Sequence, residues 1–141
     1  MLREISKREV KLTIYCDGGA RGNPGPGGIG VAIYQKGKLV KSVSKFVGSN
    51  ITNNQAEYLA VIESLKQAQK LGASEVSLRV DSQLIERQLK GEYKVKNAGL
   101  KELYGEAKRL TGQFAKFAIE YLPREENKEA DKLVNEALDR V

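Results

Sequence analysis

Four acidic residues occupy places in the sequence where a folded chain would bring carboxylates together: Asp17, Glu57, Asp81 and Asp131. Asp17 and Asp81 each follow an alternating apolar stretch, which predicts that each ends a β-strand. Glu57 and Asp131 each fall in the first turn of a stretch with helical periodicity. Converging carboxylates repel one another and raise one another's pKa, so such a set needs a counterion. A pair of divalent cations would provide it, and such a pair suits in-line attack of water on a phosphodiester.

Each of these acids also has a purely structural explanation. Asp17 precedes a stretch rich in Gly, Pro and Asn, where a solvated carboxylate in a turn is common. Glu57 follows Asn54 by three residues, which matches a capping box at the start of a helix. Asp131 would interact favourably with the dipole of the last helix, by about 0.3–1 kcal/mol. On spacing alone, both explanations stay open.

The residues that are missing restrict the chemistry further. The chain contains no histidine, which excludes histidine bases and histidine metal ligands. Cys16 is the single cysteine, so it forms no internal disulfide, and its place in a strand favours a packing role. A metal site must therefore be built from oxygen atoms, which favours Mg²⁺ or Mn²⁺ over Zn²⁺.

Length and composition predict one soluble domain over residues 1–141. Apolar residues make up 40% of the 141 and charged residues 30%, as in an ordinary globular protein with a single core. The charged N-terminal stretch, residues 1–9, lacks the apolar core of a signal peptide, so we expect a cytoplasmic protein with no membrane segment. The net charge of +6 favours a polyanionic partner.

The periodicity predicts an α/β fold with the element order β-β-β-α-β-α-α-β-α. Strands are expected at about 10–17, 29–34, 39–47, 76–81 and 117–121. Helices are expected up to about residue 71, from 82 to 89, from 100 to 112 and from 127 onward. Short connections make the first three strands antiparallel, and helical crossovers make the others parallel. Ligands lie at the carboxyl ends of such parallel strands, where Asp17 and Asp81 would meet.

The glycine-rich stretch after Asp17 is expected to be an open loop. Six glycines fall between residues 18 and 28, and they permit positive φ angles and leave the main chain uncovered. A bulky partner is therefore expected to approach the backbone closely at this point.

Four motifs in this order resemble type 1 ribonuclease H, which cuts the RNA strand of RNA–DNA hybrids. They are residues 15–25 (YCDGGARGNPG), 52–58 (TNNQAEY), 81–84 (DSQL) and 126–133 (ENKEADKL). The similarity extends over about residues 10–140, with the order and spacing of that family. It implies a ribonuclease H-like fold: a five-stranded mixed sheet, the first three strands antiparallel and the rest parallel, with helices on both faces.

The resemblance also implies roles for particular residues. Asp17, Glu57, Asp81 and Asp131 would be catalytic and would bind two Mg²⁺ ions, with Mn²⁺ as a substitute. The products would carry 5′-phosphate and 3′-hydroxyl ends. The RNA strand would contact residues of two loops: Gly18, Arg21, Gly22, Asn23, Asn53 and Asn54. Asn amides suit this role because they can both donate to and accept from a 2′-hydroxyl.

Two further residues, Thr52 and Asn97, are implied to hold a phosphate of the DNA strand. Helix capping explains both equally well from the sequence. Capping also explains Asn53 or Asn54, although the two cannot occupy one cap position.

Two departures from the family pattern matter. Many members carry a histidine in the loop before the last helix, where this chain has Arg124. Arg124 stays protonated and cannot act as a base, but it can attract a phosphate. Some members also insert a basic helix and loop, where this chain has only Lys90, Lys94 and Lys96. Because fewer phosphate contacts lower affinity, we expect weaker binding than in members with the insertion.

The leading hypothesis is thus a monomeric ribonuclease that acts on RNA–DNA hybrids and needs no nucleotide cofactor. The sequence does not decide whether double-stranded RNA is also a substrate. The alternatives are a non-catalytic domain that binds hybrids or double-stranded RNA, and a structural domain whose acids are all caps. Four clustered acids favour the enzyme, since a pure binder has no use for them.

Overall fold

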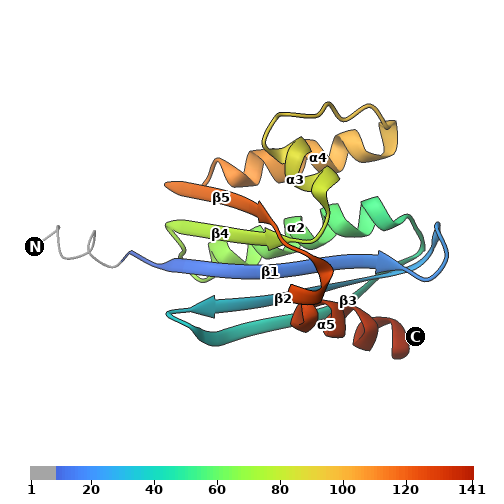
Figure 1. The fold of residues 1–141 in the computed structure, drawn as a ribbon, viewed down its shortest axis with the longest axis horizontal. Coiled ribbons are helices and arrows are strands. Elements are labelled where there is room, and N and C mark those ends of the chain that lie inside the picture. Colours follow the sequence, from blue (N-terminus) through green and yellow to red (C-terminus); the bar gives the residue numbers. More distant parts are fainter. Residues whose placement is uncertain (1–8) are drawn as a thin grey trace, which may run out of the picture.

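The computed structural model describes residues 9–141, so the charged stretch expected over residues 1–9 lies almost wholly outside the described part. Five strands form one sheet: β1 (Lys11–Ala20), β2 (Gly25–Gln35), β3 (Lys38–Ile51), β4 (Glu75–Val80) and β5 (Lys116–Tyr121). Their order across the sheet is β3-β2-β1-β4-β5 (Figure 1). β1 pairs antiparallel with β2, and β2 with β3, whereas β1–β4 and β4–β5 are parallel. The predicted mixed sheet is confirmed.

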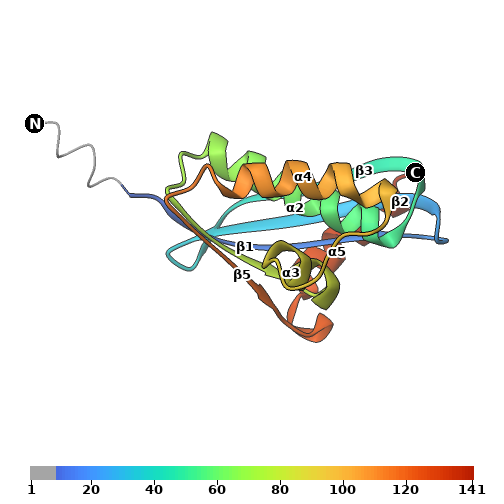
Figure 2. The same ribbon diagram turned by 90° about the horizontal axis from the view of Figure 1, so that it is seen from above.

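Helices cover both faces of this sheet, as predicted. The helical elements are α2 (Asn53–Lys70), α3 (Gln83–Leu89), α4 (Ala98–Thr111), the short 3₁₀ helix η1 (Arg124–Glu126) and α5 (Lys128–Asp139). α2 and α4 lie on one side, and α5 lies on the other (Figure 2). No helix within residues 9–141 has the length and apolar character needed to cross a membrane.

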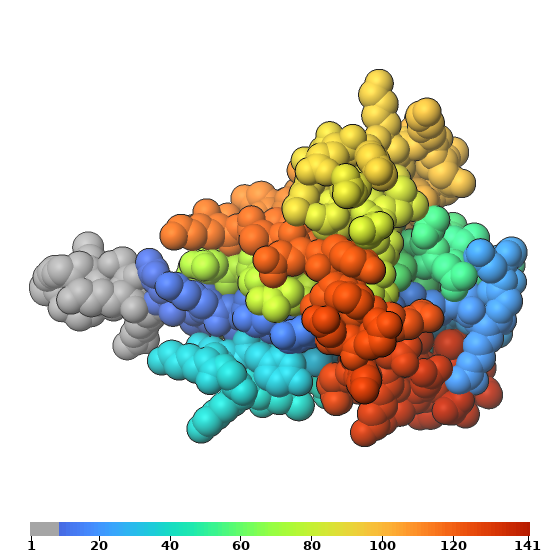
Figure 3. Space-filling view, in the orientation of Figure 1, coloured from blue at the N-terminus to red at the C-terminus, as the bar shows by residue number. Residues whose placement is uncertain are grey.

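The main core lies between the sheet and α2. Alternate residues of β1, namely Leu12, Ile14 and Cys16, are buried there. Cys16 is fully buried, and burial raises the pKa of its thiol, which agrees with the predicted packing role. On the opposite face α5 covers one end of the sheet and leaves the rest open (Figure 3).

Two glycines set how closely the helices approach the sheet. A Cβ atom at Gly18 would lie 2.2 Å from the carbonyl oxygen of Ala56 in α2. A Cβ atom at Gly30 would lie 2.2 Å from the carbonyl oxygen of Ala130 in α5. Real Cβ atoms do not come so close, so only glycine fits at either point. Both contacts fall one residue before a predicted functional acid on the helix.

The prediction of an open glycine loop is wrong for most of its length. β1 continues past Asp17 to Ala20 because residues 17–20 pair with residues 27–30 of β2. Among the glycines between residues 18 and 28, Gly22 alone has a positive φ. Glycine has no side chain and so cannot show the alternation of apolar and polar residues that predicts a strand. The extension of β1 could not be predicted for this reason. Gly18 is needed for the packing of α2 rather than for an exposed backbone.

Candidate functional site

Three of the four predicted acids converge. Asp17, Glu57 and Asp81 each offer a carboxylate oxygen, and these oxygens lie within 4.8 Å of one another. Asp17 comes from β1, Glu57 from α2, and Asp81 directly follows β4. The pairing of β1 with β4 ends at Tyr15 and Arg79, so no ladder separates Asp17 from Asp81. The sheet opens at this point, and the acids meet in the opening.

Glu57 is not the capping residue that the sequence allowed. The capping box of α2 is formed by Thr52 and Gln55: the Gln55 N–H donates to Thr52 Oγ1 at 3.1 Å, and the Thr52 N–H donates to Gln55 Oε1 at 2.9 Å. Glu57 instead accepts a hydrogen bond from the backbone N–H of Gly18 at 3.2 Å. That bond fixes its carboxylate against β1, next to Asp17.

The cluster strongly disfavours negative charge when no cation is present. The pKa of Asp17 is raised to about 7, mainly by burial and then by the charge of Asp81, while Arg124 lowers it and Asp131 raises it. Burial, followed by the charges of Asp17 and Asp81, holds the pKa of Glu57 well above its usual range. A cation between these oxygens would offset both effects.

The donor set fits a divalent metal ion. Asp17 Oδ1 is buried and has no hydrogen-bond partner within the described part of the chain. A buried polar atom without a partner calls for an explanation, and a missing ion is one. The three clustered ligands are all carboxylates, which suits Mg²⁺ or Mn²⁺ rather than a metal that prefers nitrogen or sulfur.

Asp131 lies beside this group rather than inside it. It stands in the first turn of α5 and, with Asp17 and Arg124, lines a cavity of about 320 Å³. Asn135 donates to Asp131 Oδ2 at 3.4 Å. Asp131 therefore lies at the rim of the site and is not one of the three clustered acids. Its position in the first turn of α5 also agrees with the helix-dipole explanation.

Arg124 faces the same cavity from η1. The positive charge of Arg124 lowers the pKa of Asp17, so Arg124 is close enough to act on the acids. Glu125, which follows it, lines a different cavity. Arg124 therefore brings a permanent positive charge to the cavity that Asp17 and Asp131 line.

Asn127 is a residue of the site that sequence reasoning missed. It is buried, and its Nδ2 donates to Asp81 Oδ2 at 2.8 Å and to the carbonyl oxygen of Cys16 at 2.9 Å. In the sequence it marked only the start of the last helix. An asparagine at a helix start normally indicates a cap, so no local signal distinguishes this role.

The predicted contacts of the RNA strand form one connected surface. Asn53 Oδ1 accepts from the N–H of Ala20 at 2.9 Å, and the N–H of Asn53 donates to Asn23 Oδ1 at 3.0 Å. These bonds join the β1–β2 hairpin to the start of α2. The side chain of Arg21 turns away toward α5, where its Nη2 lies 2.7 Å from Asp139 Oδ1.

A second cavity, of about 430 Å³, contains both residues predicted to hold a DNA phosphate. Asn23, Thr52, Asn53, Asn54, Gln55, Asn97 and Leu100 line it. The capping explanation is confirmed for Thr52, which begins α2, so neither Asn53 nor Asn54 caps that helix. Asn97 occupies the N-cap position of α4, as capping requires, but its side chain makes no cap bond there.

The short basic edge is weaker than its three lysines indicated. Lys90 forms an ion pair with Glu86 at 2.5 Å. Lys94 and Lys96 are exposed and, within residues 9–141, make no ion pair. In the sequence Tyr93 stands between Arg87 and these two lysines. The guanidinium carbon of Arg87 lies 5.5 Å from the centre of the Tyr93 ring.

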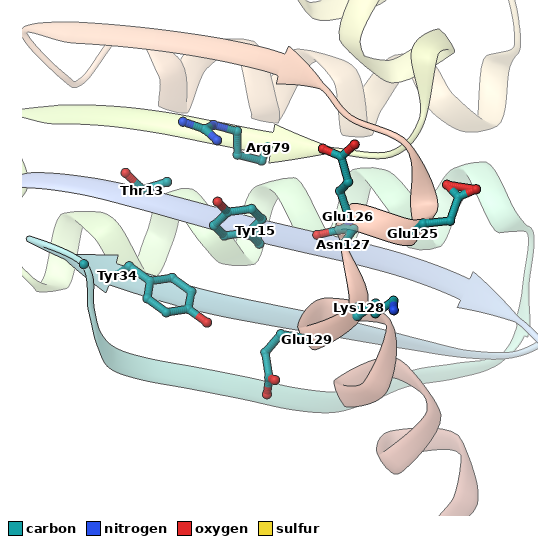
Figure 4. A pocket seen from close by; sticks show the side chains of 10 residues that line it. Thr13, Tyr15, Tyr34, Arg79, Glu125, Glu126, Asn127, Lys128 and Glu129 are labelled. Atoms are coloured by element: carbon teal, nitrogen blue, oxygen red, sulfur yellow. The ribbon is translucent and has the colours of Figure 1, made fainter.

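A cavity of about 680 Å³, larger than the one beside Asp17 and Asp131, is not the site of the acids. It lies on the open face of the sheet, where Tyr15, Tyr34 and Arg79 form its floor and Glu126 and Glu129 stand at its rim (Figure 4). The volume of a cavity therefore does not identify the site of the clustered acids. The smaller cavity, of about 320 Å³, is the one that Asp17, Arg124 and Asp131 line.

Comparison with known proteins places this geometry in context. The family model described as "Reverse transcriptase-like" matches residues 15–137. A bifunctional protein of Mycobacterium tuberculosis is 42% identical over 131 residues, which are 92% of this chain and 36% of that protein. The chain thus spans little more than a third of the length of its mycobacterial relatives.

Two solved structures are similar over nearly the whole chain. RNase H1 from Halobacterium salinarum is 38% identical with a TM-score of 0.90, and the match covers 93% of this chain and 99% of that one. LC11-RNase H1 in complex with an RNA/DNA hybrid is 43% identical with a TM-score of 0.86, and the match covers 92% of this chain and 97% of that one.

Proposed function

Because the chain belongs to the ribonuclease H family, we propose that it is a metal-dependent endoribonuclease that hydrolyses the RNA strand of RNA–DNA hybrids. The observation that carries the proposal is the convergence of carboxylate oxygens of Asp17, Glu57 and Asp81 within 4.8 Å of one another. Three acids that raise one another's pKa gain nothing in stability from meeting. Their meeting is useful when they bind a cation.

The acids would hold two divalent cations, Mg²⁺ or Mn²⁺, with Asp131 completing the set from α5. The ions would supply activation of water and neutralisation of charge for an in-line displacement that leaves 5′-phosphate and 3′-hydroxyl ends. The Gly18 N–H orients Glu57, and Arg124 attracts the scissile phosphate without taking up a proton. The chain itself therefore positions the oxygens and the substrate.

Selection of RNA would come from the surface that joins the hairpin to α2. Arg21 and Gly22 would contact the RNA strand through the backbone, since the Arg21 side chain is paired with Asp139. Gly18, which is buried and donates to Glu57, would support this surface from beneath. Asn23, Asn53 and Asn54 carry amides that can meet a 2′-hydroxyl as donor and acceptor. The Thr52 hydroxyl accepts from Gln55 and keeps its own proton free to donate to a DNA phosphate, with Asn97 opposite.

The test is a cleavage assay on three labelled duplexes: RNA–DNA hybrid, double-stranded RNA and double-stranded DNA. Each is incubated with Mg²⁺, Mn²⁺ or a chelator. We expect cleavage of the RNA strand of the hybrid with either metal and none with the chelator. Binding without cleavage would support the non-catalytic alternative, and equal cutting of DNA would contradict selection through the 2′-hydroxyl. The double-stranded RNA arm decides whether that duplex is a second substrate.

We also propose that residues 1–141 act as one catalytic domain and as a monomer. Both α2 and α5 pack on the same five-stranded sheet, and the four acids come from both sides of it. The mass of the active species, measured by light scattering with and without hybrid, tests this assignment.

A further inference from the structure

Asn127 connects the supports of three of the four acids. Its amide nitrogen donates to the Asp81 carboxylate and to the carbonyl oxygen of Cys16, the residue before Asp17. The backbone carbonyl oxygen of Asn127 accepts from the N–H of Asp131 at 3.1 Å. An amide NH₂ carries two hydrogens, so both side-chain bonds can be made at once. β1 and the end of β4 therefore meet at the Asn127 side chain, and α5 begins at its backbone.

We infer that Asn127 is a positioning residue, whose side chain holds Asp81 in register with Asp17 at the point where α5 begins. The inference rests on the proposed function, because it assigns Asn127 a part in arranging the same carboxylates. Figure 4 shows Asn127 at the junction between η1 and α5, beside Glu126. A neutral donor at this point fixes one oxygen of Asp81 without adding to the negative charge of the cluster.

The local geometry shows that helix stability does not explain this arrangement. Asparagine is among the preferred residues before a helix, where its side-chain oxygen accepts from an amide of the first turn. Asn127 precedes α5 but makes no such bond, and its φ of −116° and ψ of 36° are not those of an ordinary cap. The amide is turned toward Asp81 instead.

The remaining oxygen of the side chain supports the same conclusion. Asn127 Oδ1 is buried and has no hydrogen-bond partner among residues 9–141. A buried acceptor without a partner is unfavourable, and its retention calls for a reason outside local folding. Holding Asp81 is that reason, since the donor end of the same amide makes both of its bonds at the site.

Outer partners of metal ligands typically change metal affinity or activity by about 10- to 100-fold when they are removed. We therefore expect Asn127→Ala to weaken Mg²⁺ binding and to lower kcat, each by about 10- to 100-fold. KM for the hybrid should change by less than about threefold, because Asn127 is buried and does not reach the substrate.

The experiment compares three variants with the unaltered protein. Asn127→Ala removes both donors, and Asn127→Leu removes them while keeping the size of the side chain. Gln67→Ala is the matched control: Gln67 is also a buried amide with one unpartnered oxygen, but it lies in α2 and donates to Glu63. Each protein is titrated with Mg²⁺ by calorimetry without substrate, unfolded in urea without metal, and assayed for kcat and KM.

A weakened Mg²⁺ titration and a reduced kcat in both Asn127 variants, with neither change in Gln67→Ala, would support the inference. Asn127 variants that keep their Mg²⁺ response and kcat within about twofold would overturn it. It is also overturned if neither variant folds, since Asn127 is then structural. Failure of the unaltered protein to cleave any hybrid would contradict the proposed function, while the calorimetric titration would still decide the role of Asn127.

Discussion

Asp17 is the residue whose response to pH reports most directly on the site. Its pKa is raised from 3.8 to about 7 by burial and then by Asp81, so the metal-free native state binds a proton that the unfolded chain has already lost. Stability falls with rising pH wherever the native state binds more protons. The free energy of unfolding of the metal-free protein should therefore decrease between about pH 4 and pH 7, with Glu57 acting in the same direction.

Urea unfolding at a series of pH values in chelator checks this expectation. The decrease should amount to a few kcal/mol, since each tenfold change in proton affinity corresponds to about 1.4 kcal/mol. Saturating Mg²⁺ should largely remove the decrease, because the cation offsets the carboxylate charges. A metal-free protein whose stability rises over this range would contradict the assigned electrostatics.

Replacing Asp17 by Asn separates the catalytic role from the structural one. The variant loses a metal ligand, so cleavage of the hybrid should fall by more than the roughly 100-fold that loss of an outer partner causes. At pH 8 the metal-free variant should be at least as stable as the unaltered protein, since repulsion with Asp81 and Glu57 is reduced. Cleavage and urea unfolding are measured on the same preparation. Loss of stability with retained cleavage would show Asp17 to be structural.

At the scale of elements, the close approach of α2 to β1 depends on Gly18. A methyl group at this position would meet the Ala56 carbonyl oxygen at 2.2 Å and push away the turn of α2 that carries Glu57. We expect Gly18→Ala to destabilise the protein by roughly 1–3 kcal/mol or more, as overpacking does. Urea unfolding measures the change.

The control for that substitution is Gly105→Ala in the middle of α4. A Cβ atom at Gly105 would have nothing within 4 Å. Because alanine is the better helix former, this variant should be more stable by about 0.5–1 kcal/mol. Equal effects of the two substitutions would mean that α2 does not need the contact at Gly18.

Element boundaries also show what the sequence can and cannot predict. The order of elements along the chain and the relative directions of the strands followed from alternation and connection length, which act locally and survive folding. The extension of β1 to Ala20 was missed because paired glycines carry no alternation. The cap of α2 stayed open in the sequence because capping could explain both Thr52 and the pair of Asn54 with Glu57. Only the packing of α2 on Gly18 decides between them.

The site also contains residues that the sequence predicts and one that it does not. Four acids, including Asp131, were predicted as a group because each ends or begins an element, and topology brings such ends together. Asp17, Glu57 and Asp81 do converge, and Asp131 lies beside them. Asn127 was not predicted, because the direction in which an amide points depends on tertiary neighbours such as Asp81 and Cys16. Residues that function because they stand at the end of an element can be predicted from the element order. Residues that function because their side chain points in a given direction can be found only in the folded structure.

Over the whole molecule, the net charge of +6 leaves open whether hybrid affinity comes from general charge or from the basic edge. Lys94 and Lys96 are exposed, and within the described residues they make no ion pair. Each phosphate contact contributes about 0.9 to the slope of log K against log salt for B-DNA and about 0.7 for single strands. Replacing both lysines by Glu should thus weaken binding and lower that slope by up to about 1–2.

The matched control changes the same number of charges at Lys36 and Lys38. Those two residues border the β2–β3 turn, at the opposite end of the strands from the β1–β2 hairpin beside the acids (Figure 1). Fluorescence anisotropy with labelled hybrid, in an Asp17→Asn background to prevent cleavage, gives affinity at several salt concentrations. The Lys36/Lys38 variant should keep the slope of the parent. Equal losses in the two double variants would show that net charge alone attracts the hybrid, and that this compact chain has no local replacement for the basic insertion.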